Sequence, residues 1–236
     1  MPKYKVIIQN LIQLIEEKNL KQGDKLPSIE NLMEVYDAGK NTILKALNVL
    51  EKQAYIYQVA GSGSFVRKSK RLGYINLTAA VGLKSNLSDL DLETKMLDLK
   101  IIKPNREIMD NLNVDEDDDI YYVKRLRSVG KKGFSIEESY YVKSIVFYLN
   151  QEIVEDSIFN HLLENLNITP GFTDHFMTLE TLTKVEADLL HLEENSPAML
   201  VESIFFLKDG VPFNYSKVLY QQDAQFFVQG YSYLDM

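Results

Sequence analysis

The hydrophobic residues in the first third of the chain recur at helical spacing in three segments. The first predicts a helix ending near Asn19, with an apolar stripe formed by Tyr4, Ile7, Ile8, Leu11, Ile12, Leu14 and Ile15. A short second helix is expected after Ser28, a residue type that caps helix N-termini. The third is predicted by the i, i+3, i+4, i+7 spacing of Ile43, Ala46, Leu47 and Leu50.

A β-hairpin is expected directly after the third helix. Residues 55–59 and 64–66 are rich in β-forming side chains, and the turn between them contains Gly61 and Gly63, which can adopt positive φ. Three helices followed by a hairpin is the order of a winged helix-turn-helix domain. In such a domain the polar residues off the stripe of the third helix face base edges; here these are Lys40, Asn41 and Lys45.

From Tyr74 onward, β-rich runs alternate with a few amphipathic segments. Strands are expected at residues 95–103, 120–129, 136–142, 198–208 and 213–220, and a further strand at 226–233 would close the sheet. Helices are expected at residues 105–112, 151–165 and 184–192. Because strands and helices do not alternate strictly, the pattern predicts an α+β fold with an antiparallel sheet and not a doubly wound parallel sheet.

Length and charge favour two domains of different character. We expect a winged helix-turn-helix domain over residues 1–68, a linker over 69–73 and a second domain over 74–236. Residues 1–72 hold 12 Lys and Arg and 7 Asp and Glu, hence +5, whereas the remainder holds 14 and 27, hence −13. A basic N-terminal part on an acidic body favours nucleic-acid binding by that part, and chance variation of surface charge is the alternative.

Neither a membrane span nor a signal peptide is predicted. No run of about 18 apolar residues occurs, and the N-terminal stripe includes two acids and lacks a small-residue cleavage site. We therefore expect a cytoplasmic protein with no membrane partner. The absence of cysteine excludes disulfides, thiolate metal sites and a cysteine nucleophile.

The motifs of the common enzyme classes are missing. The chain has no phosphate-binding loop or dinucleotide fingerprint, and its three histidines have no partner at metal-ligand spacing. Glu137 and Glu138 are adjacent on a predicted strand, so they face opposite sides and cannot act as a catalytic pair. The acidic run at residues 115–119 lacks the features of a calcium loop and is expected to be a solvated turn. We predict no catalytic residue, no metal site and no cofactor.

Arg125 and Arg127 stand out in the second half. On a strand, residues i and i+2 point to one face, so the two guanidiniums can converge on a phosphate or a carboxylate. The alternative is that both arginines pair with surface acids of an acidic domain.

The N-terminal part resembles the DNA-binding domain of GntR-type bacterial repressors. The resemblance rests on Leu-Pro-Ser at 26–28, Thr42-Ile43 followed by Ala46-Leu47, and Gly-Ser-Gly-Ser-Phe-Val at 61–66, all three in register. It implies DNA contacts by residues of the third helix, by Ser28 before the second helix and by Gly63 in the hairpin. The residues of the third helix are Lys40, Asn41, Thr42 and Lys45. Glu30 and Leu44 depart from the family pattern, because arginines that contact DNA usually stand at both positions.

The second half is similar to the UTRA effector domain of the HutC branch of GntR regulators. The similar segments are KMLDLKIIKP at 95–104, YYVKRLRSVG at 121–130, IEESYYV at 136–142 and DGVPFNYSKVLY at 209–220. This resemblance implies a chorismate-lyase-like antiparallel sheet and an effector cavity lined by Arg125, Arg127, Glu137, Ser157, Asn214 and Tyr220. Asn214 replaces a common glutamate, so the effector is expected to differ from an amino-sugar phosphate.

Together these features predict a homodimeric transcription regulator, expected to be a repressor. Its partners would be double-stranded operator DNA and a small anionic metabolite, such as a sugar phosphate or an organic acid, which controls operator affinity. Two alternatives remain at this stage. One is a metabolite-sensing protein that has lost tight operator recognition through Glu30 and Leu44, and the other is an enzyme built on the chorismate-lyase-like fold.

Overall fold

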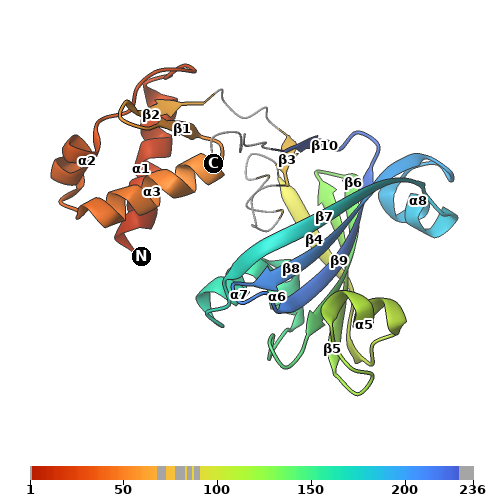
Figure 1. Cartoon of the computed structure of the whole chain (residues 1–236). Coiled ribbons are helices and arrows are strands. Elements are labelled where there is room, and N and C mark those ends of the chain that lie inside the picture. The colour runs from red at the N-terminus through yellow and green to blue at the C-terminus, as the bar shows by residue number, and fades with distance from the viewer. Residues whose placement is uncertain (1, 68–72, 78–82, 84–86, 88–90, 229–236) are drawn as a thin grey trace. The chain divides into compact units, whose positions relative to one another are not determined.

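The computed structural model describes residues 2–67, 73–77, 83, 87 and 91–228. These residues belong to two compact units, one formed by Met1–Ala79 with Phe227–Met236 and the other by Ala80–Phe226. Figure 1 shows both units with their elements labelled, and each is described by itself below. Among the described residues, no helix is long and apolar enough to span a membrane.

The first unit contains the predicted three helices and hairpin. Its elements are α1 (Lys3–Glu17), α2 (Ile29–Tyr36), α3 (Lys40–Lys52), β1 (Ile56–Val59) and β2 (Gly63–Val66). The Ser28 hydroxyl accepts a hydrogen bond from the Asn31 amide and caps α2, as predicted. Asp37 then ends α2 in the left-handed region, and Gly39 caps α3, so a three-residue turn separates the two helices.

The apolar stripes of α1 and α3 form the core of this unit. Ile43, Ala46, Leu47 and Leu50 are all buried, and they pack with Ile7, Leu11 and Leu32. Burying an aliphatic side chain of this size contributes roughly 1.5–3 kcal/mol. Helical spacing alone was therefore sufficient to identify which side of α3 faces inward, and by exclusion which side faces solvent.

The hairpin of β1 and β2, called the wing below, is held in place by the segment before α2. Gly61 and Gly63 adopt φ of +73° and +115°, as the turn prediction required. The Leu26 amide donates to the Ser64 carbonyl, and the Gly23 amide donates to the Val66 carbonyl, each at 2.9 Å. The wing is thus attached along β2 to the chain that leads into α2.

The second unit is built on a six-stranded antiparallel sheet, which confirms the predicted α+β class. The strand order is β4-β5-β6-β9-β8-β7, so β4 and β7 are the outer strands. The bounds are β4 Leu92–Ile102, β5 Ile120–Val129, β6 Lys132–Val142, β7 Pro170–Thr181, β8 Pro197–Leu207 and β9 Pro212–Gln221. The turn between β8 and β9 contains Gly210 at φ +87°.

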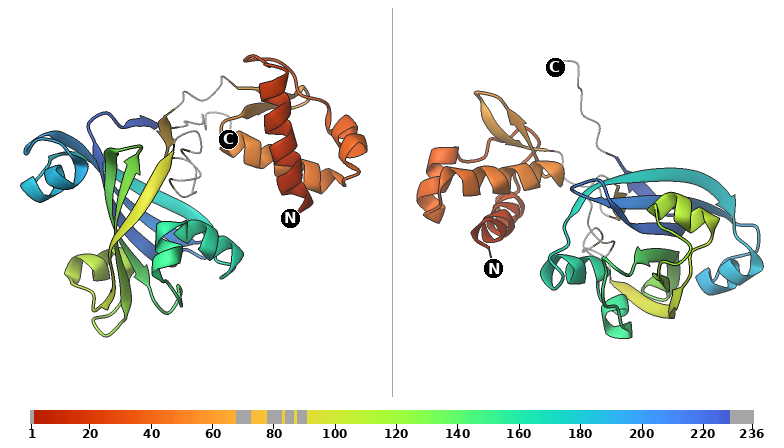
Figure 2. Two further views of the ribbon diagram at one scale, coloured as in Figure 1. Left: turned by 180° about the vertical axis from the view of Figure 1, so that it is seen from behind. Right: turned by 60° about the horizontal axis from the view of Figure 1, so that its bottom comes forward.

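Helices cover both faces of this sheet, as the two views in Figure 2 show. The helices are α5 (Arg106–Leu112), α6 (Gln151–Glu155), α7 (Ile158–Glu164) and α8 (Lys184–Leu190). Tyr121, Val123 and Tyr141 pack against α6 and α7. Their sequence neighbours Ile120 and Val142 pack against α5 on the opposite face, because successive strand residues alternate between faces. The helix α8 lies on the α5 side, over Ile136 and Leu126.

Two expectations for the second half were wrong in detail, and one strand was missed. The single helix predicted over residues 151–165 is two helices, because Asp156 leaves helical geometry (φ −90°, ψ −93°) and Ser157 caps α7. The long strand β7 was not predicted, since PGFTDHFMTLET shows no clean alternation. The strand expected at 226–233 does not close the main sheet: β10 (Gln225–Phe227) pairs with β3 (Tyr74–Asn76), and residues 229–233 lie outside the described residues. The basic residues 68–71 also lie outside them.

Candidate functional site

The outward face of α3 presents the predicted polar residues. Lys40, Asn41 and Lys45 are exposed and Thr42 is half-buried, all in the N-terminal half of the helix. The Lys45 Nζ lies 4.1 Å from the centre of the Tyr4 ring on α1. This cation–π contact holds the ammonium beside the helix and leaves it exposed.

Ser28 and Gly63 lie together at the start of α2 and the tip of the wing. Both line a hollow of about 510 Å³ that also includes Lys25, Glu30 and Gln58. A Cβ atom on Gly63 would lie 3.1 Å from the Lys25 Cε atom, so a larger residue here would require the lysine side chain to shift slightly. The hollow thus combines a cation, a helix N-terminus and exposed backbone.

Glu30 and Leu44 occupy exposed or half-exposed places near these residues. Glu30 lies in the first turn of α2, where its own backbone amide and the Ser28 hydroxyl lower the pKa of the carboxyl group, with the charge of Lys40 adding to the effect. Leu44 lines a shallow hollow on α3 with Asn41 and Lys45. The first unit therefore offers cations on α3 and a carboxylate at the start of α2.

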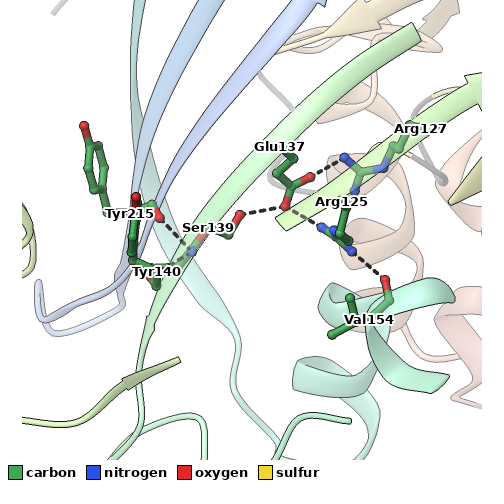
Figure 3. A network of polar contacts seen from close by, with 8 residues as sticks. Arg125, Arg127, Glu137, Ser139, Tyr140, Val154 and Tyr215 are labelled. Atoms are coloured by element: carbon green, nitrogen blue, oxygen red, sulfur yellow. Dashed lines mark hydrogen bonds and ion pairs between the residues drawn. The ribbon is translucent and has the colours of Figure 1, made fainter. Parts of the chain in front are cut away.

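In the second unit, Arg125 and Arg127 point to the same face of β5, as predicted, and converge on Glu137 of β6 (Figure 3). Each guanidinium donates to a different oxygen of this carboxylate. Arg125 Nη1 also donates to the carbonyl oxygen of Val154 in α6, at 3.0 Å. The Ser139 hydroxyl donates to Glu137 Oε1 at 2.6 Å. The alternative of pairing with surface acids does not describe this arrangement, because all three charged side chains are buried.

Strand register explains why these residues meet. Arg125 is directly opposite Glu137, and Arg127 is opposite Ser135, which in turn is opposite Tyr220 of β9. One row further along the same face, Ser139, Ser216 and Ser203 follow one another across β6, β9 and β8. We call the buried polar side chains of this face the polar cluster; its members are Arg125, Arg127, Ser135, Glu137, Ser139, Ser203, Asn214 and Ser216.

Four serines of the polar cluster were missed in the sequence. Their signal is weak but present: Ser135 and Ser139 occur at the same strand parity as Glu137, and Ser216 at that of Asn214. His175 of β7 extends the Ser203 row, and its Nδ1 lies 2.8 Å from the Ser203 hydroxyl oxygen. Cross-strand neighbours of this kind depend on the register between strands, and the sequence of a single strand does not reveal that register.

Electrostatics inside the cluster favours an ionised Glu137. Burial by itself would raise the pKa of Glu137, but the two guanidiniums and the Ser139 hydroxyl outweigh it and hold the pKa well below its usual value. Burial and the neighbouring charge of Arg125 lower the pKa of Arg127. Two guanidiniums thus share one carboxylate, and the three side chains together carry one net positive charge.

Several atoms of the cluster have no hydrogen-bond partner in the part of the chain that the structure describes. These atoms are Arg125 Nε, Arg127 Nε, Ser135 Oγ and Asn214 Oδ1. Leaving a buried polar group without a partner costs about 1–3 kcal/mol, so natural proteins do so rarely and often at binding sites. The cluster combines net positive charge with spare donors, which is the chemistry that binds anions.

The remaining predicted effector residues lie in or beside the polar cluster. Ser157 is buried in the helical layer over this face, where its hydroxyl caps α7 by accepting from the Asn160 amide. Asn214 is buried and its Nδ2 donates to the backbone carbonyls of Tyr140 and Tyr215. Tyr220 is buried on β9, and burial raises the pKa of its hydroxyl, which keeps it a neutral donor.

Clusters of acidic or metal-ligating side chains give no further candidate site among the described residues. No group of three or more His, Asp or Glu side chains suited to a metal ion occurs among the described residues. In the acidic turn, Asp118 accepts a hydrogen bond from the Asp115 amide, and Asp119 pairs with Lys103 at 3.0 Å. Lys143 also pairs with Asp119, so lysines compensate this carboxylate at the end of the turn.

Comparison with known proteins identifies both units. Residues 3–66 match the family of bacterial regulatory proteins called the gntR family. Residues 88–225, more than half of the chain, match the UTRA domain. The protein is a GntR-family regulator. The GntR family and the relatives described next are transcriptional regulators and not enzymes, which excludes the enzyme alternative.

Relatives of this GntR-family regulator come from Bacillus subtilis. The chain is 47% identical to the HTH-type transcriptional regulator YydK over 99% of this chain and all of that protein. The crystal structure of YydK superposes with a TM-score of 0.83, covering 98% of this chain and all of the other. The chain is also 27% identical to the regulator TreR and 24% identical to the repressor NagR, covering 96% and 97% of this chain and 95% and 94% of those proteins.

The family assignment gives both units a general role. GntR-family regulators bind operator DNA through the helix-turn-helix domain and small-molecule effectors through the UTRA domain. The effector-binding domain of the trehalose repressor TreR, 24% identical, superposes with a TM-score of 0.54 over 59% of this chain and 97% of that one, which supports the fold of the second unit. The chain is therefore a transcription regulator that joins a DNA-binding unit to an effector-binding unit.

Proposed function

We propose that this protein is a cytoplasmic repressor of the HutC branch that binds a two-fold operator as a homodimer. A small anionic metabolite, such as a sugar phosphate or an organic acid, controls its operator affinity. The observation that supports the effector assignment best is the convergence of two buried guanidiniums that share a single carboxylate.

The DNA-binding half of the proposal uses α3 and the wing. The N-terminal half of α3 enters the major groove with Lys40, Asn41, Thr42 and Lys45, and the wing around Gly63 reaches the minor groove. Ser28 lies at the N-terminus of α2, where a helix dipole and a hydroxyl favour a phosphate. The basic charge of residues 1–72 supplies the phosphate attraction that an acidic chain otherwise lacks.

The effector half uses the polar cluster. An anion that binds between Arg125 and Arg127 takes up the spare donors and neutralises the net positive charge beside Glu137. Arg125 also holds the carbonyl of Val154, so an anion that moves this guanidinium acts on α6 directly. Linkage requires that the effector bind the operator-bound and released forms with different affinity. Equal affinity would leave the equilibrium between these two forms unchanged.

The proposal predicts that an Arg125→Ala, Arg127→Ala double variant loses the effector response and keeps DNA binding. A thermal-shift screen of sugar phosphates and sugar acids first finds a ligand, since a ligand bound to the native state raises the melting temperature. Calorimetry then measures its affinity, and gel shifts measure operator binding. We expect the affinity of the double variant to fall at least about 100-fold, because two charge-assisted pairs worth roughly 1.5–3 kcal/mol each are lost.

Lys124→Ala is the matched control. Lys124 is the neighbour of Arg125 on β5, but it faces the other side of the sheet and pairs with Glu138. Its loss should leave effector affinity within about twofold of the wild type, because the side chain lies on the face of β5 away from the polar cluster. Undiminished effector affinity in the folded double variant would refute the anion site.

A second candidate function is a metabolite sensor without tight operator recognition. It is favoured by Glu30, whose carboxylate lies beside Ser28 at the proposed DNA surface. Gel shifts against the DNA upstream of its own gene, between about 50 and 200 mM salt, separate the two. Sequence-selective, salt-sensitive retardation supports the repressor, and the absence of selectivity supports the sensor.

A further inference from the structure

One leucine of α3 does not take part in the core of the first unit. Leu44 is half-buried, and among the described residues it is not one of the partly buried apolar side chains that pack on this core. Val49 of the same helix does pack on the core, and Ile43 and Leu47 belong to its buried part. The apolar surface of Leu44 is therefore presented on the outer side of α3.

Leu44 lies in the half of α3 that the proposed function places in the major groove. It lines a shallow hollow of about 390 Å³ on this helix, together with Asn41, Lys45 and Asn48. Asn41 precedes Leu44 by three residues and Asn48 follows it by four, so both are its neighbours on the helix surface. An apolar side chain is thus flanked by polar ones on the side of α3 that faces DNA.

The polar side chains on both sides of Leu44 are held by contacts within the first unit. The Lys45 Nζ lies 4.1 Å from the centre of the Tyr4 ring. Gln58 Nε2 of the wing donates to Asn48 Oδ1 at 3.0 Å. These contacts fix the surroundings of Leu44 before DNA binds, so little side-chain entropy is lost on binding.

Base edges in the major groove offer one large apolar group to such a side chain. Thymine presents its 5-methyl group there, whereas guanine, adenine and cytosine present hydrogen-bond donors and acceptors without a methyl group. We propose that Leu44 contacts the methyl group of a thymine in each half of the operator and thereby selects a T·A pair. This contact rests on the proposed function, because it requires α3 to lie in the major groove.

The chemistry around Leu44 disfavours a G·C pair at the same place. Leu44 has no side-chain donor or acceptor, so the O6 and N7 atoms of a guanine beneath it would lose water without gaining a partner. Asn41 is exposed one turn earlier, and asparagine is a residue type that bonds to N6 and N7 of adenine. Methyl burial and the cost of an unpaired guanine therefore act in the same direction.

A uracil scan of the operator tests this contact, because uracil is thymine without the 5-methyl group. The full chain first selects its operator from a pool of random-sequence duplexes. Each thymine of one half-site is then replaced by uracil, one position at a time, and gel-shift titration measures the dissociation constant. For the wild type we expect one position at which uracil weakens binding roughly fourfold, the factor that corresponds to the burial of one methyl group.

Leu44→Ala should abolish the difference between thymine and uracil at that position, because the shorter side chain does not reach the methyl group. Leu44 lies outside the core and alanine favours helices, so the variant should fold, which circular dichroism checks. Lys45→Ala is the matched control. It should weaken binding to the thymine and uracil duplexes alike through the lost charge, and so keep the ratio at roughly four.

A second selection, with Leu44→Arg, supplies an independent measurement. Arginine bonds to O6 and N7 of guanine, so the selected base pair at this position should change from T·A to G·C. An unchanged T·A preference in Leu44→Arg would overturn the proposal. So would a Leu44→Ala protein that still distinguishes uracil from thymine.

The same experiments separate this contact from the proposed function. If the wild type selects an operator but binds every uracil-substituted duplex like the thymine duplex, the repressor assignment stands and Leu44 does not read thymine. If the selection enriches no sequence, the repressor assignment fails and the Leu44 contact fails with it.

Discussion

Glu137 holds two arginines of the polar cluster at once, and so it decides how that cluster behaves. Without an effector it acts as an internal anion that satisfies part of the hydrogen-bonding capacity of both guanidiniums. An effector that binds there does not meet a bare pair of positive charges, but a cluster that already contains one negative charge. This arrangement limits the favourable ligand charge, because one negative charge neutralises the net charge of the three side chains and any further negative charge is left uncompensated.

The ion pairs make stability depend on Glu137 and on pH. Because the folded-state pKa of Glu137 lies below its ordinary value of 4.5, its ionised form stabilises the fold above that pH, and the contribution is lost as pH falls through the lower pKa. Glu137→Gln should therefore lower the free energy of unfolding at neutral pH by about 3–5 kcal/mol, since it leaves two buried cations unpaired. The difference should shrink in acid. Urea titrations across the acid range measure it.

Glu116→Gln is the control for this series. It removes a carboxylate from the exposed acidic turn, so its effect should stay within about 0.5 kcal/mol at every pH. A Glu137→Gln protein as stable as the wild type at neutral pH would contradict the paired geometry.

At the DNA surface, the charge of Glu30 is the residue-level feature to test. Glu30→Arg replaces a carboxylate with a cation next to Ser28 and Lys40, so it should raise affinity for DNA. The slope of log affinity against log salt concentration should become steeper by about one. Gel shifts on operator and unrelated DNA measure both. Glu17→Arg makes the same charge change at the end of α1 and should have a smaller effect. Equal effects of the two variants would show that Glu30 is remote from the phosphates.

At the scale of elements, the wing depends on its glycine conformation. Gly63 combines a φ of +115° with the nearby Lys25 side chain, so a side chain at this position is strained by the backbone and crowded. In the second unit, the strands β5, β6, β8 and β9 provide the polar cluster. Asn214 of the cluster donates to the backbone of β6, and Ser157 caps α7. The polar cluster therefore depends on several strands and not on any single element.

Gly63→Ala should destabilise the wing by about 1–2 kcal/mol and weaken operator binding. Gel-shift titration is the measurement, with thermal unfolding in parallel. Ser62→Ala is the control in the same turn, because Ser62 has an ordinary φ and its backbone bond to Val59 does not involve the side chain. If both variants bind operator like the wild type, the wing does not reach the DNA.

For the whole molecule, the difference in charge between the two parts of the chain matches the difference in their function. The basic residues 1–72 include the DNA-binding unit, and the acidic remainder includes the sheet with its polar cluster. The acidic body should bind no DNA by itself, so only the N-terminal unit attracts phosphate. The proposed homodimer would bring two such units to one operator, which raises affinity by effective concentration without new contacts.

The sequence alone determined the elements with strong local signals. The stripes of α1 and α3, the Ser28 cap, the two wing glycines and the matched parity of Arg125 and Arg127 all arise from short-range periodicity and turn chemistry. It also determined the family, since the motifs of both units lie in register. The break between α6 and α7 was missed because one residue, Asp156, leaves helical geometry within an otherwise helical pattern.

Only the tertiary structure decided which side chains become neighbours across the strands of the sheet. Register placed Glu137 against both arginines and aligned Ser139, Ser216 and Ser203, although Ser139 and Ser216 are 77 positions apart in the chain. It also left β7 at an edge with apolar side chains exposed on both faces, which no local pattern in PGFTDHFMTLET reveals. Strand order and pairing are set by the packing of the whole sheet, so a site built across strands is not encoded in any one of them.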